Sequence, residues 1–311
     1  MSTVTQPLAI PRNGVLTLAQ DYAELIKLRV TTLIIMTAWC GYYFGAVKSG
    51  VSSVSWGLFH ALVGIGLIAA GTAALNEVME HEIDGRMRRT ANRPMPAGRM
   101  SLLHGTVAGA AMAIGGILYL GFALNALTGW LGLATSIVYL AAYTPLKKIH
   151  PICTFVGAFP GAMPGVLGWT AIRGKLEWEA LVMFAIVFFW QFPHFFSIAW
   201  LYREDYEDGG IRMLPVVEAD GKSTARQILI YSILLVPVSL LPTLLHMSGK
   251  IYFGGALVLS LALLYFGIRL ATFKAAPVTA RSKQRARHLL QATVFYLPLL
   301  FILMMINTVT A

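Results

Sequence analysis

The residues from Trp56 to Asp84 read WGLFHALVGIGLIAAGTAALNEVMEHEID, an apolar run that ends in a polar and acidic segment. The apolar part has the length that a helix needs to cross a bilayer, about 20 residues. Asn76, Glu80 and Asp84 recur every four residues, and on a helix this spacing stacks three oxygen-bearing side chains along one face. A membrane helix has no structural reason to end this way, so the segment indicates a functional site.

Arginines follow this segment at once: Arg86, Arg88, Arg89, Arg93 and Arg99. Hard oxygen ligands next to arginines suit a diphosphate that binds together with Mg²⁺. The alternative is a solvated helix end with mixed charges, but Asn76 is expected at membrane depth, where polar groups are costly and usually face a cavity. We therefore predict that Asn76, Glu80 and Asp84 bind the metal. Arg89 and Arg93 are predicted to bind the diphosphate, and the other arginines to set the topology.

The composition is that of an all-α polytopic membrane protein. Of the 311 residues, 57% are hydrophobic and 12% are charged, and the mean hydropathy is +0.68, whereas a soluble domain carries about twice that share of charge. Nine helices are predicted, near 30–47, 55–76, 102–124, 127–143, 152–172, 178–200, 226–246, 251–272 and 288–308. Residues 1–20 are mixed polar without the apolar core of a signal peptide, and we expect them to be flexible.

Lysine and arginine are unevenly divided between the two sides that nine spans define. Twenty of the 24 fall in the N-terminal segment and in the loops on its side, and the other four are Lys48, Arg173, Lys175 and Lys250. By the positive-inside rule, the N-terminus and the basic loops are cytoplasmic, and the C-terminus lies opposite. Topology thereby explains the formal charge of +10, and no nucleic-acid partner is expected.

A second acidic cluster follows the sixth predicted helix, at Glu204, Asp205, Glu207 and Asp208. Taken alone, it is equally well an ordinary acidic pair at the membrane surface. Both clusters are predicted at cytoplasmic helix ends, where together they would hold Mg²⁺ on both sides of a diphosphate, and Mg²⁺ needs only one or two carboxylates. The second cluster is therefore a further candidate for metal binding next to the first.

Two further motifs carry candidate residues. Tyr143–Lys148 reads YTPLKK at the end of the fourth predicted helix, where Lys147 would reach a diphosphate oxygen as a point charge. Trp190–Phe196 reads WQFPHFF, late in the sixth predicted helix. His194 in this motif would contact a planar substrate, ligate iron or serve as a structural residue, and the sequence leaves these roles open.

At this point the motifs resemble those of the UbiA intramembrane prenyltransferases. The pattern Asn76-x-x-x-Glu80-x-x-x-Asp84, followed by Met87-x-Arg89-Thr90-x-x-Arg93-Pro94, is similar to the first aspartate-rich motif of that family. Five further segments resemble the family members that farnesylate haem B: Tyr143–Lys147, Trp190–Phe195, Asp205-Tyr206, Met213–Pro215 and Asp21–Arg29. The resemblance covers about residues 20–308, although many members have aspartate where this chain has Glu80.

The resemblance implies one membrane domain over residues 1–311, with nine helices around a central cavity that opens to the cytoplasmic side. It implies transfer of a farnesyl group from farnesyl diphosphate to a vinyl group of haem B, with addition of water, giving haem O and diphosphate. Mg²⁺ is the implied cofactor. The resemblance also implies Asp205 as a further metal ligand. Catalytic roles are implied for the metal-binding residues and Lys147, and substrate contacts for Glu204, Tyr143 and His194.

The same resemblance implies a bacterial inner membrane as the location, and a downstream haem A synthase or terminal oxidase as a partner. A prenyltransferase with a quinone precursor or a chlorophyll-like acceptor is the alternative within enzymes. A transporter is the alternative from another class, but its acidic residues would lie near the middle of the membrane. Here the acidic clusters lie at predicted helix ends on one side, which favours the enzyme.

Overall fold

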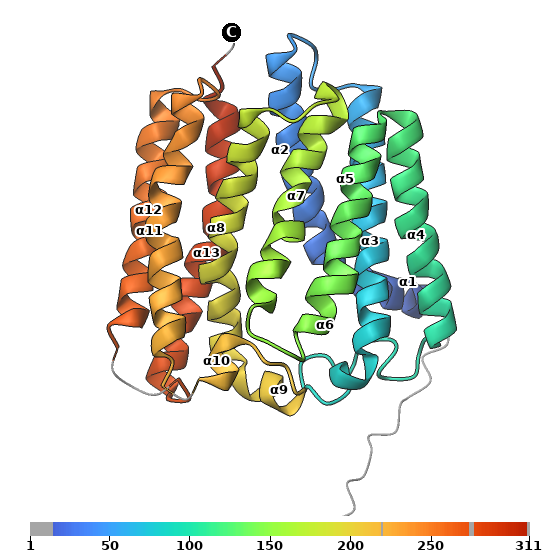
Figure 1. Cartoon of the computed structure of the whole chain (residues 1–311), viewed down its shortest axis with the longest axis vertical. Coiled ribbons are helices and arrows are strands. Elements are labelled where there is room, and N and C mark those ends of the chain that lie inside the picture. Colours follow the sequence, from blue (N-terminus) through green and yellow to red (C-terminus); the bar gives the residue numbers. More distant parts are fainter. Residues whose placement is uncertain (1–14, 219, 274–276, 310–311) are drawn as a thin grey trace, which may run out of the picture.

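The computed structural model describes residues 15–218, 220–273 and 277–309, which form a bundle of long helices (Figure 1). Within them, nine helices are long and apolar enough to cross a membrane, which confirms the predicted number. They are α2 (Leu28–Lys48), α3 (Trp56–Asp84), α4 (Leu102–Ala123), the composite span Ala126–Leu146, α7 (Cys153–Arg173), α8 (Trp178–Leu201), α11 (Lys222–Leu244), α12 (Lys250–Ala271) and α13 (Ala280–Ile306).

Three short helices lie at the lower end of the bundle in Figure 1: α1 (Val15–Leu25), α9 (Arg203–Asp208) and α10 (Leu214–Val217). Of the N-terminal segment that we expected to be flexible, residues 1–14 lie outside the described residues, and residues 15–20 belong to α1. The C-terminal end of α3 also lies toward this end of the bundle (Figure 1).

Helix α3 extends beyond its apolar run. The sequence predicted an end near residue 76, whereas the helix ends at Asp84. Continuing the helix keeps the backbone groups of the polar turns paired where water is scarce. As a result Asn76, Glu80 and Asp84 lie on one continuous helix, and all three are buried.

The fourth span changes its winding before its end. Helix α5 (Ala126–Ile137) passes into the π-helix η1 (Val138–Tyr143) and then into the single turn α6 (Thr144–Leu146). Pro145 lacks an amide hydrogen and cannot continue the regular pattern. The Thr144 hydroxyl instead donates to the carbonyl oxygen of Tyr139, at 2.9 Å. Such π-turns frequently occur at functional sites, and this one leads directly to Lys147.

Helices α2 and α7 cross at glycines, which lets their backbones approach closely. A Cβ atom on Gly168 of α7 would lie 1.9 Å from the carbonyl oxygen of Ala38, and one on Gly41 of α2 would lie 1.9 Å from that of Gly165. The backbone of α2 therefore lies against the glycine-rich face of α7. The contact holds α7 inside the bundle, where 67% of its most apolar stretch of 18 residues is buried.

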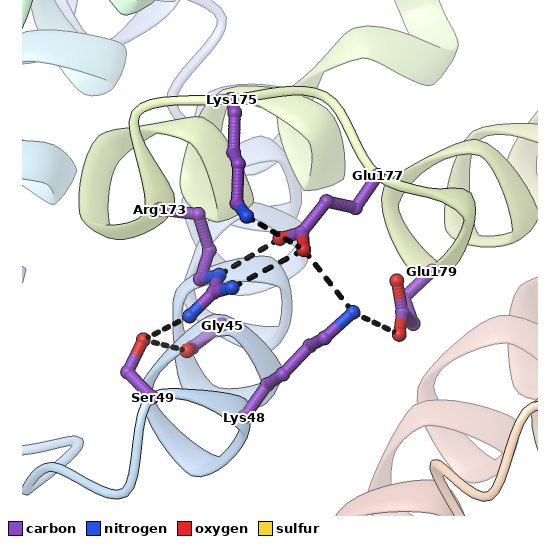
Figure 2. Close-up of polar contacts among 7 residues, drawn as sticks. All are labelled: Gly45, Lys48, Ser49, Arg173, Lys175, Glu177 and Glu179. Atoms are coloured by element: carbon purple, nitrogen blue, oxygen red, sulfur yellow. Dashed lines mark hydrogen bonds and ion pairs between the residues drawn. The ribbon is translucent and has the colours of Figure 1, made fainter.

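At the end of the bundle opposite Asp84, ion pairs join α2, α7 and α8 (Figure 2). Arg173 donates to Glu177 through Nε at 2.8 Å and through Nη2 at 3.1 Å, and its Nη1 donates to Ser49 at 2.8 Å. The Lys48 amine lies 3.2 Å from the Glu177 carboxylate and also donates to Glu179. Charges from three helix ends therefore neutralise one another at this side of the bundle.

We expect Gly168→Ala to lower the free energy of unfolding by about 1–3 kcal/mol, because the added methyl group would collide with the backbone of α2. Thermal unfolding of the detergent-solubilised protein measures this loss. Gly165→Ala is the matched control one turn away, because its Cβ would have no neighbour closer than 3.6 Å. Equal destabilisation by both substitutions would contradict the close crossing.

We expect Glu177→Gln to lower the free energy of unfolding by about 1 kcal/mol at neutral pH. Hydrogen bonds from Arg173 lower the pKa of Glu177 from its usual 4.5 to about 2. A carboxyl with a depressed pKa stabilises the fold above its unfolded value, and this contribution is lost as pH falls from 4.5 toward 2. The difference in melting temperature between wild type and variant should therefore shrink below pH 4.5. Glu207→Gln, at an exposed carboxylate, should show no such convergence.

Candidate functional site

A cavity of about 80 Å³ lies beside the C-terminal end of α3. Its wall comes from segments that are far apart in the sequence, and it carries four cationic and two carboxylate side chains among apolar and aromatic ones. The lining residues are Lys27, Glu80, Asp84, Met87, Arg89, Thr90, Arg93, Tyr143, Lys147, Tyr206, Ile211 and Met213. The structure thus brings together residues from both the first acidic segment and the YTPLKK motif.

Both carboxylates of this cavity are paired with a cation from another segment. The Lys147 amine lies 2.9 Å from one oxygen of Glu80 and donates to the other at 3.0 Å. Arg93 Nη1 donates to Asp84 at 2.5 Å. Glu80 is 5% exposed and Asp84 is 1% exposed, so both ion pairs are shielded from water. Removing one partner of such a buried ion pair leaves an uncompensated charge and strongly destabilises the fold.

Asn76 lies one turn deeper and connects three segments through its amide group. Its Oδ1 accepts from the Lys27 amine at 2.6 Å, and its Nδ2 donates to the Thr144 hydroxyl at 3.1 Å. Thr144 belongs to the turn α6 that follows the π-helix. Asn76 therefore holds the α1–α2 connection and the end of the fourth span against α3, and its own position is fixed by both contacts.

Lys27 is a cavity residue that the motif analysis did not select. It is held between α1 and α2 in a left-handed backbone conformation, with φ 48°, which lysine rarely adopts. Burial, together with the positive charges of Arg93 and Lys147, lowers the pKa of its amine to about 8. The sequence signal that could have identified Lys27 is the resemblance of the Asp21–Arg29 segment to the family.

Aromatic rings hold two of the cations in the cavity wall. Arg89 Nη2 donates to the Tyr206 hydroxyl at 3.0 Å, and its guanidinium carbon lies 5.0 Å from the centre of the Tyr206 ring. The Lys147 amine lies 4.6 Å from the centre of the Tyr143 ring. Cation–π contacts of this kind are stronger away from water. The two rings therefore help to orient Arg89 and Lys147 in the cavity wall.

The loop after α8 reaches the cavity through its apolar and aromatic residues. Tyr206, Ile211 and Met213 line the cavity, and the Arg212 amide donates to the Lys147 carbonyl at 2.7 Å. The predicted residues Glu204 and Asp205 are not part of the cavity wall. Glu204 instead accepts from the Lys283 amine at 2.7 Å and 2.8 Å, and its side chain is 58% exposed.

His194 also lies outside the wall of this cavity. Its Nδ1 is 2.9 Å from the Thr293 hydroxyl of α13, and its ring stacks on Trp190 with 4.7 Å between the ring centres. Trp190 Nε1 donates to the Thr293 carbonyl at 2.8 Å, so both residues of the WQFPHFF motif contact the same point of α13. These contacts favour the structural role for His194 among those that the sequence left open.

The cavity fits a hard cation only when a ligand contributes oxygen atoms. No group of three or more His, Cys, Asp and Glu side chains that could hold a metal ion occurs within the described residues. Glu80 and Asp84 are nevertheless buried on one face of α3, and the Lys147 amine is the ion-pair partner of both Glu80 oxygens. Because Mg²⁺ usually takes one or two carboxylates together with phosphate oxygens and water, this donor set fits it.

Comparisons with known proteins identify the fold and the family. A solved digeranylgeranylglyceryl phosphate synthase superposes with a TM-score of 0.75 at 17% identity, over 93% of this chain and 98% of its own. A UbiA homolog from Archaeoglobus fulgidus, solved with GPP and Mg²⁺, gives a TM-score of 0.61 at 14% identity, over 91% and 99%.

A relative from Koribacter versatilis, named protoheme IX farnesyltransferase, is 64% identical over 307 residues, which cover 99% of this chain and 99% of the relative. The model of the UbiA prenyltransferase family matches residues 33–289. This chain therefore belongs to the UbiA prenyltransferase family.

Proposed function

We propose that this protein transfers a farnesyl group from farnesyl diphosphate to a vinyl group of haem B, with addition of water, and releases haem O and diphosphate. The observation that carries the proposal is the cavity in which four cations and two carboxylates converge at the end of α3. The acceptor is proposed because the relative from Koribacter versatilis, which matches over nearly the whole chain, is named protoheme IX farnesyltransferase.

Four side chains would neutralise the diphosphate. Arg89 and Arg93 offer forked donors, which match phosphate oxygens in pairs. Lys27 and Lys147 offer compact ammonium groups at the wall of the same cavity. Lys147 and Arg93 already bind the carboxylates of Glu80 and Asp84, so an incoming diphosphate would exchange one anionic partner for another. The exchange would avoid leaving a buried cation without a partner.

Glu80 and Asp84 are the residues that would hold Mg²⁺, with the Asn76 amide oxygen one turn away on the same helix. The metal would stabilise negative charge on the leaving diphosphate. Asp205 was predicted to share this role, but the structure favours Glu80 and Asp84 because Asp205 lies outside the cavity wall. The longer side chain at Glu80, where many members have aspartate, keeps the carboxylate and extends its reach.

The side chains of the cavity would act mainly on the leaving group. As the bond between the farnesyl carbon and the diphosphate oxygen breaks, Lys147, Arg89 and Arg93 would stabilise the developing charge. The electron pair of the haem vinyl group would then form the new carbon–carbon bond. Water would add its oxygen to the remaining cationic carbon and release a proton. Tyr143 and the apolar wall residues would limit the entry of other water molecules.

The proposed orientation places this cavity on the cytoplasmic side of a bacterial inner membrane. The end of the bundle that carries the cavity also carries most of the lysines and arginines, whereas Lys48, Arg173, Lys175 and Lys250 lie at the opposite end. The positive-inside rule favours the cytoplasm for the more basic side. A haem A synthase or a terminal oxidase would then receive the product.

The first test is a product assay. Membranes that contain the protein would be incubated with haem B, farnesyl diphosphate and Mg²⁺, and the haems separated by mass. We expect a species heavier than haem B by one farnesyl group and one hydroxyl group, and we expect a chelator to abolish it. Prenylation of an aromatic acid instead of haem would contradict the proposed acceptor and favour the quinone-type alternative.

Variants of the α3 residues sharpen the same assay. Asp84→Ala and Asn76→Ala should reduce turnover by at least about a hundredfold, as expected for the loss of a metal ligand or of its support. Glu80→Asp should retain activity because it keeps the carboxylate. Glu82→Gln, at an exposed carboxylate of the same helix, is the control and should behave as wild type. Turnover near wild type in Asp84→Ala would remove the metal role from that residue.

Lys27 offers a test of the diphosphate site that does not depend on the acceptor. We expect Lys27→Met to weaken the binding of farnesyl diphosphate about tenfold, because a charge-assisted hydrogen bond of roughly 1.5 kcal/mol is lost. Equilibrium binding of radiolabelled farnesyl diphosphate to the purified protein measures the change. Lys148→Met is the matched control, since Lys148 is exposed and outside the cavity wall. Equal affinity of both variants for farnesyl diphosphate would contradict diphosphate binding by Lys27 and leave only its hydrogen bond to Asn76.

A further inference from the structure

A second basic cavity lies between α12 and α13, at the same end of the bundle as the first. Its volume is about 250 Å³, and it shares no lining residue with the cavity beside α3. The end of α12 and the first turns of α13 form its wall: Arg269, Phe273, Arg281, Gln284, Arg285 and His288. The proposed prenyl transfer uses none of these residues.

The arginines of this cavity are not neutralised by carboxylates. None of the ion pairs formed within the described part of the chain includes Arg269, Arg281 or Arg285. Lys283 of the same helix turn, by contrast, binds Glu204. Three guanidinium groups around one hollow repel each other, so an anion bound there would relieve the repulsion.

Arg285 is held in place for such an anion. Its Nη1 donates to the carbonyl oxygen of Arg269 at 2.6 Å, and its guanidinium carbon lies 4.1 Å from the centre of the Phe273 ring. These two contacts leave further N–H groups of the guanidinium for a ligand, because arginine carries five donors. A donor that is already oriented loses less conformational entropy when the anion binds.

Exposed apolar side chains continue from the cavity toward the middle of the bundle. On α12, Leu261 and Tyr265 precede Arg269 by eight and four residues, and they are 49% and 56% exposed. On α13, Phe295 and Leu299 follow His288 by seven and eleven residues, and they are 67% and 47% exposed. These spacings keep each pair on the helix face that also lines the cavity. The two faces therefore form an apolar surface that ends at a cluster of arginines.

We propose that this cavity binds the phosphodiester headgroup of an anionic glycerophospholipid, whose acyl chains lie on the apolar surface between α12 and α13. The cavity matches the headgroup in charge and in its position at the end of membrane-spanning helices, where basic pockets bind anionic headgroups. Arginine forks match the oxygens of a phosphate. A free phosphate would contact only the arginines, whereas a lipid would contact both the arginines and the apolar surface.

The test measures lipid binding to the purified full-length protein in detergent by native mass spectrometry. Phosphatidylglycerol and phosphatidylcholine would be titrated separately, and bound copies counted. We expect phosphatidylglycerol to bind more tightly than phosphatidylcholine. Arg281→Gln and Arg285→Gln should each weaken phosphatidylglycerol binding about fivefold, because one cation near an anionic lipid contributes about 1 kcal/mol. Binding of phosphatidylcholine should not change in either variant.

Arg287→Gln is the matched control, because Arg287 is an exposed arginine of the same helix outside the cavity wall. It should bind phosphatidylglycerol as wild type does, and equal weakening by Arg287→Gln and Arg281→Gln would overturn the proposal. Arg281 makes no hydrogen bond or ion pair with other described side chains, so its loss should leave the melting temperature unchanged. Displacement of phosphatidylglycerol by equimolar inorganic phosphate would instead identify a site for the free anion and overturn the lipid assignment.

Discussion

The structure depends on how the two buried carboxylates at the end of α3 are neutralised, because burying an unpaired charge costs free energy. Glu80 and Asp84 are almost fully buried, and an unpaired charge there would be strongly unfavourable. Each is paired with a cation from a different segment, Lys147 after the fourth span and Arg93 in the loop after α3. The connections between helices therefore converge on α3, and the charges that pair with the carboxylates are the ones that we propose to bind an anionic substrate.

Backbone packing supports that convergence from the other side. The close crossing of α2 and α7 at glycines, and the ion pairs around Glu177, hold the opposite half of the bundle together. The π-helix before Thr144 sets the direction of the chain that carries Lys147. Because Asn76 binds both Lys27 and Thr144, a single amide on α3 couples the start of the second helix to the end of the fourth span.

The family assignment and the geometry of the cavity support the proposed reaction in different ways. The cavity would account for the diphosphate half of the proposed chemistry, through cations that carboxylates and aromatic rings already orient. The haem half is supported by the relative's name and by near-complete coverage of the chain rather than by a pocket wall. Trp190 and His194 of the WQFPHFF motif join α8 to α13 through Thr293, and a contact of His194 with haem stays a prediction.

The sequence by itself determined the nine spans, because bilayer-length apolar runs and charge placement are local properties of the chain. It also determined that Asn76, Glu80 and Asp84 share one helix face, since a four-residue spacing requires nothing beyond the helix itself. Only the tertiary structure decided the partners of these residues. Lys27 entered the cavity through a left-handed turn, and Glu204 turned outward to Lys283, because side-chain contacts between distant segments depend on how whole helices pack rather than on spacing along the chain.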